Sequence, residues 1–545
     1  MPDATVLDAP TEIARRRTFA IISHPDAGKT TLTEKLLLYG GAIQLAGAVR
    51  AGSRQRSATS DWMELEKQRG ISISSTLLQF DYEGYVVNLL DTPGHKDFSE
   101  DTYRVLTAVD SVIMVIDAAK GIEERTQKLF EICRLRGIPI FTFMNKMDRP
   151  SQDPLELLDE LERILGIHAY PVTWPLGSGQ EFRGVYDRLE KRLHLYERTA
   201  HGKYRAPERV ADVYDAPLKE ALGAKAHAQW LEEVEMLEAA GASFDPQQVL
   251  AGNITPVFFG SGITNFGVQQ LLDYFVRYAP PPQARVSTMG PMAPASDVFS
   301  SFVFKVQANM NPRHRDRLVF IRVCSGRFEK DMVVIDPTTK KAIRLSHSQK
   351  IFGQDRESVE VAYPGDIVGL VTHNAFPIGA TLTTDPSIQY DEIPRFPPEA
   401  FATIRSAGTA KYKQFREGLD QLLEEGVIQA FNTPETGQTS ALLGAVGQLQ
   451  FDVVLYRLQT EYGADPRMEP APYKTVRWFD ADVSLPALQK EYFGSGTKLA
   501  TDLRGRPVLL FPSQWAVDYF VKEHPKLTLH TISPHDLSLP EMKKA

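Results

Sequence analysis

A short segment that combines one glycine, one lysine and several hydroxyl residues has the residue types that hold a phosphate and its metal ion. It lies between an apolar run and a helical pattern and consists of Ser23, His24, Pro25, Asp26, Ala27, Gly28, Lys29 and Thr30, with Thr31 following. Apart from its initial serine, this spacing is that of a phosphate-binding loop, whose backbone N–H groups and helix N-terminus cradle an anion. We expect Lys29 to reach the β- and γ-phosphates of a nucleotide and Thr30 to offer its hydroxyl to Mg²⁺.

A second motif with metal- and phosphate-binding residue types ends the apolar run at residues 85–91. It consists of Asp91, Thr92, Pro93, Gly94 and His95. Carboxylate oxygens suit Mg²⁺, so we expect Asp91 to hold the ion through a water molecule. Because glycine has no side chain, the amide of Gly94 could closely approach a γ-phosphate.

A third motif predicts which base is bound. Asn145, Lys146, Met147 and Asp148 end one apolar run, and Ser261 and Gly262 follow another. The carboxylate of Asp148 can accept two parallel hydrogen bonds from the N1–H and 2-amino groups of guanine, a donor pair that adenine lacks. Leaving that carboxylate unpaired would be costly, which disfavours ATP. We expect Asn145 to brace neighbouring loops, Lys146 to lie along the ring, and Ser261 to lie near the guanine carbonyl.

These motifs gather in space only if the apolar runs form one sheet. Strands are expected at 18–23, 73–82, 85–91, 112–117, 138–145 and 254–259, and helices at 28–38, 98–109, 124–136 and 268–278. Strands that alternate with helices predict a mostly parallel α/β sheet covered on both faces. Ligands bind at the carboxyl ends of such strands, which is where each motif falls.

Proline-rich breaks at 279–282 and 394–398 predict three domains in this chain of 545 residues. We assign 1–282 to a P-loop nucleotide-binding domain with an insertion at about 150–253, 283–394 to a β-barrel domain, and 395–545 to a smaller α+β domain. The insertion is expected to contain a helix at 155–165, a hairpin near 174–184 and a charged helix near 219–240. Residues 483–545 show no chemistry that can be interpreted.

Composition narrows the class of protein. There is no apolar run of about 20 residues and no signal-peptide pattern, and Cys133 and Cys324 lie far apart. A cytoplasmic protein without a membrane segment is therefore expected. The net charge of −8 argues against general coating of nucleic acid, although residues 305–350 carry eleven basic residues against four acids. That stretch is either a solvated face of the barrel or a contact surface for RNA.

At these motifs the sequence resembles the translational GTPases. Residues 69–73 (RGISI) resemble their first switch, in which Ser72 would coordinate Mg²⁺, and residues 91–95 resemble the second. The resemblance implies that His95 orients or activates the attacking water and that Asp26 lies near a monovalent cation. Residues 444–452 resemble a stretch in the third domain of elongation factor G. Residues 23–30, 58–64, 68–75 and 174–179 resemble the bacterial GTPase release factors in particular, and that resemblance extends from about 17 to 534.

The resemblance implies a ribosome-dependent GTPase that binds GTP or GDP with Mg²⁺ and ejects codon-reading class I release factors after peptide release. Its partners would be the ribosome and those factors, and we expect a monomer. The sequence ends before the last two domains of elongation factor G, so translocation is not expected. Two alternatives stay open at this point: another ribosome-associated GTPase, and a regulatory GTP-binding module acting through protein partners. A generic ATPase conflicts with the motif that ends at Asp148.

Overall fold

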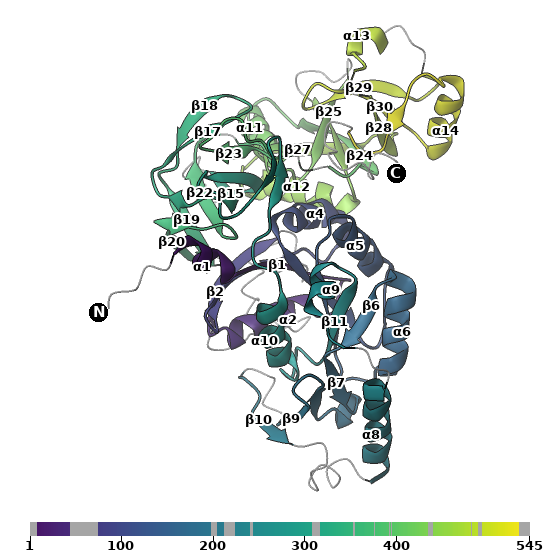
Figure 1. Ribbon diagram of the computed structural model, residues 1–545. Coiled ribbons are helices and arrows are strands. Elements are labelled where there is room, and N and C mark those ends of the chain that lie inside the picture. The colour runs from purple at the N-terminus through teal and green to yellow at the C-terminus, as the bar shows by residue number, and fades with distance from the viewer. Residues whose placement is uncertain are drawn as a thin grey trace. The chain divides into compact units, whose positions relative to one another are not determined.

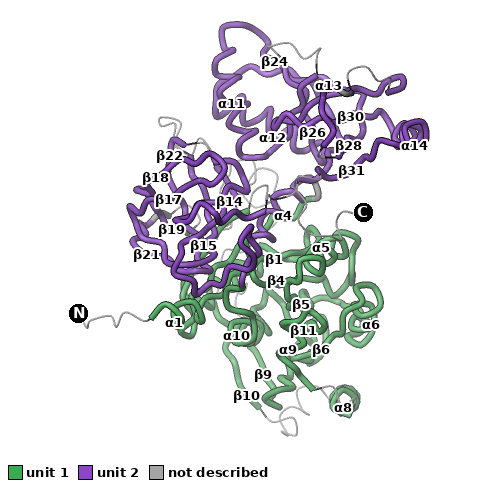
Figure 2. The backbone as a smooth tube through the Cα atoms, turned by 45° about the horizontal axis from the view of Figure 1, so that its top comes forward, with its two compact units in different colours: residues 1–95, 108–283, 351–355 green, residues 96–107, 284–350, 356–545 purple. Residues whose placement is uncertain are grey.

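A computed structural model describes most of the chain as two compact units (Figure 2). The described residues are 8–43, 75–197, 204–211, 224–239, 243–307, 317–352, 355–374, 376–391, 393, 395–433, 440–480, 482–488 and 493–533. Unit 1 contains residues 1–95, 108–283 and 351–355, and unit 2 contains residues 96–107, 284–350 and 356–545. One boundary between the units therefore falls directly after His95.

Unit 1 is built on a seven-stranded sheet. In spatial order its strands are β2 (Thr76–Tyr82), β3 (Tyr85–Asp91), β1 (Arg16–Ser23), β4 (Ser111–Asp117), β5 (Ile140–Asn145), β11 (Ile254–Phe259) and β6 (His168–Pro171). Every pair in this sheet is parallel except β2 with β3. Strands β1, β4 and β5 are buried along their whole length, as expected for a sheet covered on both faces.

Helices cover both faces of this sheet (Figure 1). The helices of unit 1 are α1 (Ala9–Ala14), α2 (Lys29–Tyr39), α5 (Glu124–Leu135), α6 (Pro154–Leu165), α8 (Ala224–Ala239), α9 (Pro246–Leu250) and α10 (Val268–Tyr278). Helices α2 and α10 pack together over the main core, in which Leu36 and Phe275 meet strand residues such as Phe19. This core holds the strand ends that carry the motifs in fixed positions.

The insertion forms a separate antiparallel sheet of four strands within unit 1. Its elements are β7 (Thr173–Leu176), the 3-10 turn η2 (Gly179–Glu181), β8 (Gly184–Asp187), β9 (Arg192–Tyr196) and β10 (Glu208–Ala211). Helix α8 is attached to it by Trp230, whose indole nitrogen donates to the carbonyl of Pro175 at 3.0 Å. The expected insertion hairpin and charged helix are thus both present.

Unit 2 contains two larger antiparallel sheets of eight strands each. In spatial order the first has β18 (Lys341–Arg344), β17 (Val333–Asp336), β23 (Thr381–Thr383), β14 (Ser300–Gln307), β15 (Arg317–Ser325), β22 (Ile367–Thr372), β19 (Ser348–Phe352) and β20 (Asp355–Ser358). Two small strand pairs accompany it: β12 (Arg285–Ser287) with β13 (Gly290–Met292), and β16 (Phe328–Glu329) with β21 (Val361–Ala362). The short β-branched runs of the sequence form this sheet.

The second sheet of unit 2 combines strands with helices. Its strands are β27 (Pro466–Pro470), β24 (Ala400–Ser406), β26 (Ser440–Ala445), β25 (Gln429–Asn432), β29 (Lys498–Asp502), β30 (Pro507–Phe511), β28 (Thr475–Phe479) and β31 (Leu529–His530), and its helices are α11 (Tyr412–Glu424), α12 (Gln448–Thr460), α13 (Leu485–Leu488) and α14 (Gln514–Glu523). The 3-10 turn η1 (Lys96–Phe98) and helix α4 (Ser99–Ala108), apart from its last residue, group with this unit.

The predicted fold class is confirmed, since a parallel-type α/β sheet precedes two antiparallel regions, the second with helices. Strands β2 and β3 are joined by a two-residue turn in which Glu83 and Gly84 both have positive φ. The domain boundaries stay a prediction. None of the described helices combines the length and apolarity needed to cross a membrane.

A buried ion pair in unit 2 predicts a large stability effect. Arg457 on α12 contacts Glu425 at 2.5 and 3.0 Å and Glu461 at 2.9 Å, and the Arg457 and Glu425 side chains are less than one tenth exposed. Burial alone lowers the pKa of Arg457, but the two carboxylates outweigh it and raise that pKa above its ordinary value. Arg457→Met would leave two carboxylates without their cation, so we expect a loss of about 3–5 kcal/mol in the free energy of unfolding of this unit.

Urea unfolding followed by tryptophan fluorescence would measure this loss. The matched control is Arg405→Met, which removes an exposed partner of Glu469 and should cost less than about 1 kcal/mol. Equal losses for the two variants would contradict the prediction.

Candidate nucleotide-binding site

Strand register brings the sequence motifs to one edge of the unit 1 sheet. Neighbouring residues across the parallel pairs are Ile21 and Asp91, Ser23 and Val115, Asp117 and Asn145, and Met144 and Phe259. The loops that follow β1, β3, β5 and β11 therefore leave the same edge of the sheet. The structure brings together all the candidate residues named above except Ser72, which lies outside the described residues, as does the whole of segment 69–73.

The loop between β1 and α2 has the backbone that a phosphate cradle needs. Asp26 and Gly28 have φ of 65° and 99°, so the loop turns back on itself before the helix begins at Lys29. A side chain at Gly28 would place its Cβ 2.2 Å from Nδ2 of Asn145, so this position excludes larger residues. Successive amides in such a turn, next to a helix N-terminus, favour a bound anion.

Lys29 and Asp91 form the charged centre of this edge. Lys29 Nζ lies 2.5 Å from Asp91 Oδ1, and both side chains are almost fully buried. Asp91 Oδ2 is buried and has no hydrogen-bond partner among the described residues. A buried carboxylate oxygen in that state is costly, and a hydrated Mg²⁺ would satisfy it. The residues present therefore fit a metal-bound phosphate, with the Thr30 hydroxyl at the start of α2.

Asn145 ties two loops of the base-binding side together. Its Nδ2 donates to the carbonyl of Ala27 at 2.8 Å, and its Oδ1 accepts the amide of Gly262 at 2.9 Å. The side chain is 2 % exposed, so these hydrogen bonds replace water. Asn145 thus fixes the phosphate loop and the loop after β11 in relation to each other.

Lys146 is held by partners that position it for a ring contact. It has a φ of 69°, and its Nζ donates to the carbonyl of Asp26 at 2.5 Å and to Asp117 Oδ2 at 2.7 Å. Asp117 is a buried residue at the end of β4 that the sequence analysis did not single out. The signal was present, because Asp117 ends an apolar run in the same way as Asp91 does.

Asp148 and Ser261 face each other at the far side of the site. Ser261 Oγ donates to Asp148 Oδ1 at 2.6 Å, and Ser261 is fully buried. The amide of Met147 donates to the carbonyl of Gly260 at 3.1 Å, which joins the two loops further. A half-buried carboxylate that is braced by one hydroxyl keeps lone pairs for the two donors of a guanine edge.

The motif after β3 lies against the phosphate loop. Thr92 Oγ1 donates to the carbonyl of Ile21 at 2.7 Å, and a Cβ on Gly94 would lie 3.9 Å from Cα of Pro25. His95 is half-buried at the end of this motif. His24, in the loop itself, has Nε2 3.3 Å from Glu123, a partner that the sequence pattern did not indicate.

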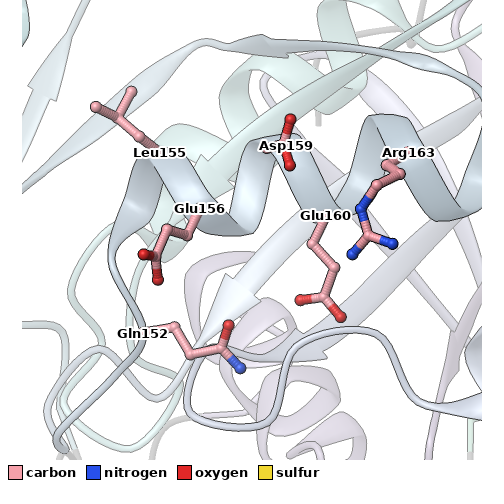
Figure 3. A pocket seen from close by; sticks show the side chains of 6 residues that line it. All are labelled: Gln152, Leu155, Glu156, Asp159, Glu160 and Arg163. Atoms are coloured by element: carbon pink, nitrogen blue, oxygen red, sulfur yellow. The ribbon is translucent and has the colours of Figure 1, made fainter.

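Two other surfaces do not belong to this site. A pocket along α6 is lined by Gln152, Leu155, Glu156, Asp159, Glu160 and Arg163 (Figure 3), and its three acids would repel phosphates. In the described part of the basic stretch, Lys330, Arg344 and Arg317 pair with carboxylates, which favours the solvated-face interpretation there.

Three successive stretches of the chain match known protein families. Residues 14–281 match the elongation factor Tu GTP binding domain, residues 298–385 match elongation factor G domain 2, and residues 390–521 match the class II release factor RF3, C-terminal domain. Together with the strand-end site, the first match defines a GTP-hydrolysing enzyme of the translational GTPase class.

Proteins of similar sequence identify the family within the translational GTPase class. A peptide chain release factor 3 of Gloeobacter violaceus is 54% identical over 96% of this chain and 98% of its own length. One from Synechococcus elongatus is 53% identical over 96% and 94%. The chain belongs to the peptide chain release factor 3 family. A crystal structure of a protein from Thermus thermophilus shares the fold, with a TM-score of 0.67 and 23% identity over 90% of this chain and 72% of that one.

Proposed function

We propose that this protein is a ribosome-stimulated GTPase of translation termination that drives codon-reading class I release factors off the ribosome after peptide release. The single observation that carries the proposal is the guanine-nucleotide site of unit 1 in a chain that is 54% identical, almost end to end, to a peptide chain release factor 3. Ribosomal RNA and class I release factors are its proposed partners, and the chain acts as a monomer in the cytoplasm.

GTP would be bound together with Mg²⁺, which would neutralise negative charge on the phosphates. Residues 23–31 wrap the phosphates, Lys29 exchanges its contact with Asp91 for phosphate oxygens, and Thr30 and Ser72 offer hydroxyls to the ion. Asp91 holds the ion through water. Asn145, Lys146, Asp148 and Ser261 select guanine, and His95 orients the attacking water. Asp26 lies beside the phosphates, where a monovalent cation would compensate its charge.

The segment after His95 follows the second switch directly and makes contacts within unit 2, so this route can transmit a movement of the switch. The carboxylate of Asp97 accepts the amide of Leu449 at 2.8 Å, at the N-terminus of α12. Gly447, the N-cap of that helix, has no side chain, so Asp97 acts as the capping group from a distant segment. Further along, Arg104 on α4 donates to the carbonyls of Glu425 and Gly426 at 3.3 and 3.0 Å. A movement of the second switch would therefore pull directly on α12 and α11.

Gly447→Ala tests this route. A Cβ at position 447 would lie 2.1 Å from Cγ of Asp97, so the capping contact cannot form unchanged. We expect ribosome-stimulated kcat to fall about 10- to 100-fold, because small displacements of positioned groups cost that much. GTP affinity of the isolated protein should change by less than about twofold, since Gly447 is remote from the nucleotide residues in sequence and belongs to the other unit.

The control is Gly408→Ala, where nothing lies within 4 Å of the added atom. An unchanged kcat in Gly447→Ala would contradict the route.

The proposed function is tested on ribosomes stopped after peptide release that still hold a labelled class I release factor. Addition of this protein with GTP should release the label rapidly, and GDP or a non-hydrolysable analogue should not support repeated rounds. If ribosomes stimulate GTP hydrolysis but the label stays bound, the protein acts at another step. If ribosomes do not stimulate hydrolysis at all, the ribosomal role is wrong.

A further inference from the structure

Three potential metal ligands meet on the β8–β9 hairpin of the insertion, away from the strand-end site. Asp187 is the last residue of β8, Glu190 lies in the turn, and His194 lies on β9. One carboxylate oxygen of each acid and one ring nitrogen of His194 all lie within 4.8 Å of one another. The register explains this, because Asp187 pairs with Arg192 and therefore lies diagonally across from His194 on the same face of the hairpin.

His194 is arranged as metal-binding histidines are. Its Nδ1 contacts the carboxylate of Glu208 on the neighbouring strand β10, and that carboxylate also accepts from Gln270 at 3.1 Å. Because a carboxylate only accepts, Nδ1 carries a proton, and in the neutral tautomer with that proton Nε2 offers the lone pair that a metal ion needs. His194 is 8 % exposed, and its Nε2 is buried with no hydrogen-bond partner among the described residues. A histidine whose other nitrogen is fixed by a carboxylate is the usual arrangement around zinc.

The carboxylate of Asp187 is also held in place by hydrogen bonds. Its Oδ1 accepts the amides of Leu189 and Glu190, and the hydroxyl of Tyr274, each at 2.9 Å. The side chain of Asp187 is buried. Glu190 is exposed and can rotate toward the other two residues.

We propose that Asp187, Glu190 and His194 bind one Zn²⁺ ion, with His194 Nε2 and one oxygen from each acid as the protein ligands and water at the fourth position. A mixed nitrogen and oxygen set with one imidazole suits Zn²⁺ better than Mg²⁺ or Ca²⁺. Bonds of about 2.0–2.2 Å require the three ligand atoms to close by roughly an ångström, which rotation of Glu190 supplies.

Bound zinc would join three parts of unit 1. Glu208 connects the site to β10, while Tyr274 and Gln270, one turn apart on α10, connect it to the helix that covers the main sheet. The ion would thereby fix the insertion to the nucleotide-binding core. This role is structural and independent of the Mg²⁺ that accompanies GTP.

The test uses the full-length protein, stripped with a chelator and saturated with GDP and excess Mg²⁺ so that the nucleotide site is filled. Titration with Zn²⁺ against a chromogenic chelator should give one site per chain. Glu190→Gln should weaken that site by at least about tenfold and His194→Gln by more, while Glu208→Gln should weaken it about 10- to 100-fold. Because Glu190 is exposed, its substitution leaves the fold intact, and the melting temperature that Zn²⁺ raises in the wild type should rise less in this variant.

Glu197→Gln, which removes an exposed carboxylate just beyond β9, is the matched control and should bind as the wild type does. No saturable binding at one ion per chain would overturn the proposal and leave His194 as a buried side chain that contacts Glu208. Binding that is equal in wild type, Glu190→Gln and His194→Gln would also overturn it, because the ion would then lie elsewhere.

Discussion

His95→Ala should reduce ribosome-stimulated GTP hydrolysis by about 10²- to 10⁴-fold, the range that a positioned proton acceptor contributes. The reason is the place of His95, which is half-buried at the end of the motif whose Gly94 lies against Pro25 of the phosphate loop. Alanine removes the imidazole without touching Lys29 or Asp91. GTP and GDP affinities should therefore stay within about twofold of the wild type, because binding and turnover depend on different groups.

Single-turnover hydrolysis with saturating ribosomes and a fluorescent-nucleotide titration would separate the two effects. His168→Ala is the matched control, because that histidine is exposed in the same unit and has only a long contact of 3.8 Å to Glu162. If His95→Ala retains more than about a tenth of the stimulated rate, a different group orients the water. If it loses nucleotide affinity to the same extent as turnover, His95 is a structural residue of the loop.

The outcome for this site shows which interactions a sequence can predict. Asp91, Asn145 and the phosphate loop were predictable because each ends an apolar run, and parallel strands bring such ends to one edge. Asp117 also ends an apolar run, but it was missed because two alanines and a lysine follow it rather than a recognisable motif. Its role depends on the register between β4 and β5, which places it beside Asn145. The pattern of apolar runs predicts that strands exist, but it does not predict their order.

Contacts between distant segments were not predictable in the same way. A helix at 98–109 was expected, but nothing in its sequence indicated that Asp97 caps α12 or that Arg104 reaches the end of α11. These contacts join residues more than 300 positions apart. The proposed zinc ligands were not predicted for a related reason, because no cysteine or histidine pair at a metal-binding spacing marks them in the sequence. The spacing Asp-x₂-Glu-x₃-His becomes a cluster only when the hairpin register aligns its diagonal positions.

Asp148→Asn should change the preferred nucleotide base from guanine to xanthine. The mutant amide presents an N–H donor where the carboxylate offered only acceptors, so one of the two hydrogen bonds from guanine becomes a clash of donors. A hydrogen bond to a charged group contributes about 1.5–3 kcal/mol, so loss of one or two should weaken GTP binding by at least about 10-fold. Xanthine has a carbonyl in place of the 2-amino group and should bind the variant more tightly than GTP does.

The contacts around Asp148 can all persist in the Asp148→Asn variant, so the substitution changes only the groups that face the base. Ser261 Oγ, 2.6 Å from Asp148 Oδ1, can donate equally well to an amide oxygen, and Asn145 keeps both of its loop contacts. Competition of GTP and xanthosine triphosphate for the purified protein measures the preference directly. Asp153→Asn is the control, because Asp153 is the exposed N-cap of α6 and asparagine caps a helix as well as aspartate does. An unchanged preference in Asp148→Asn would mean that the base is selected by another group, and that the loop after β5 serves only to hold Lys146 and Asn145 in place.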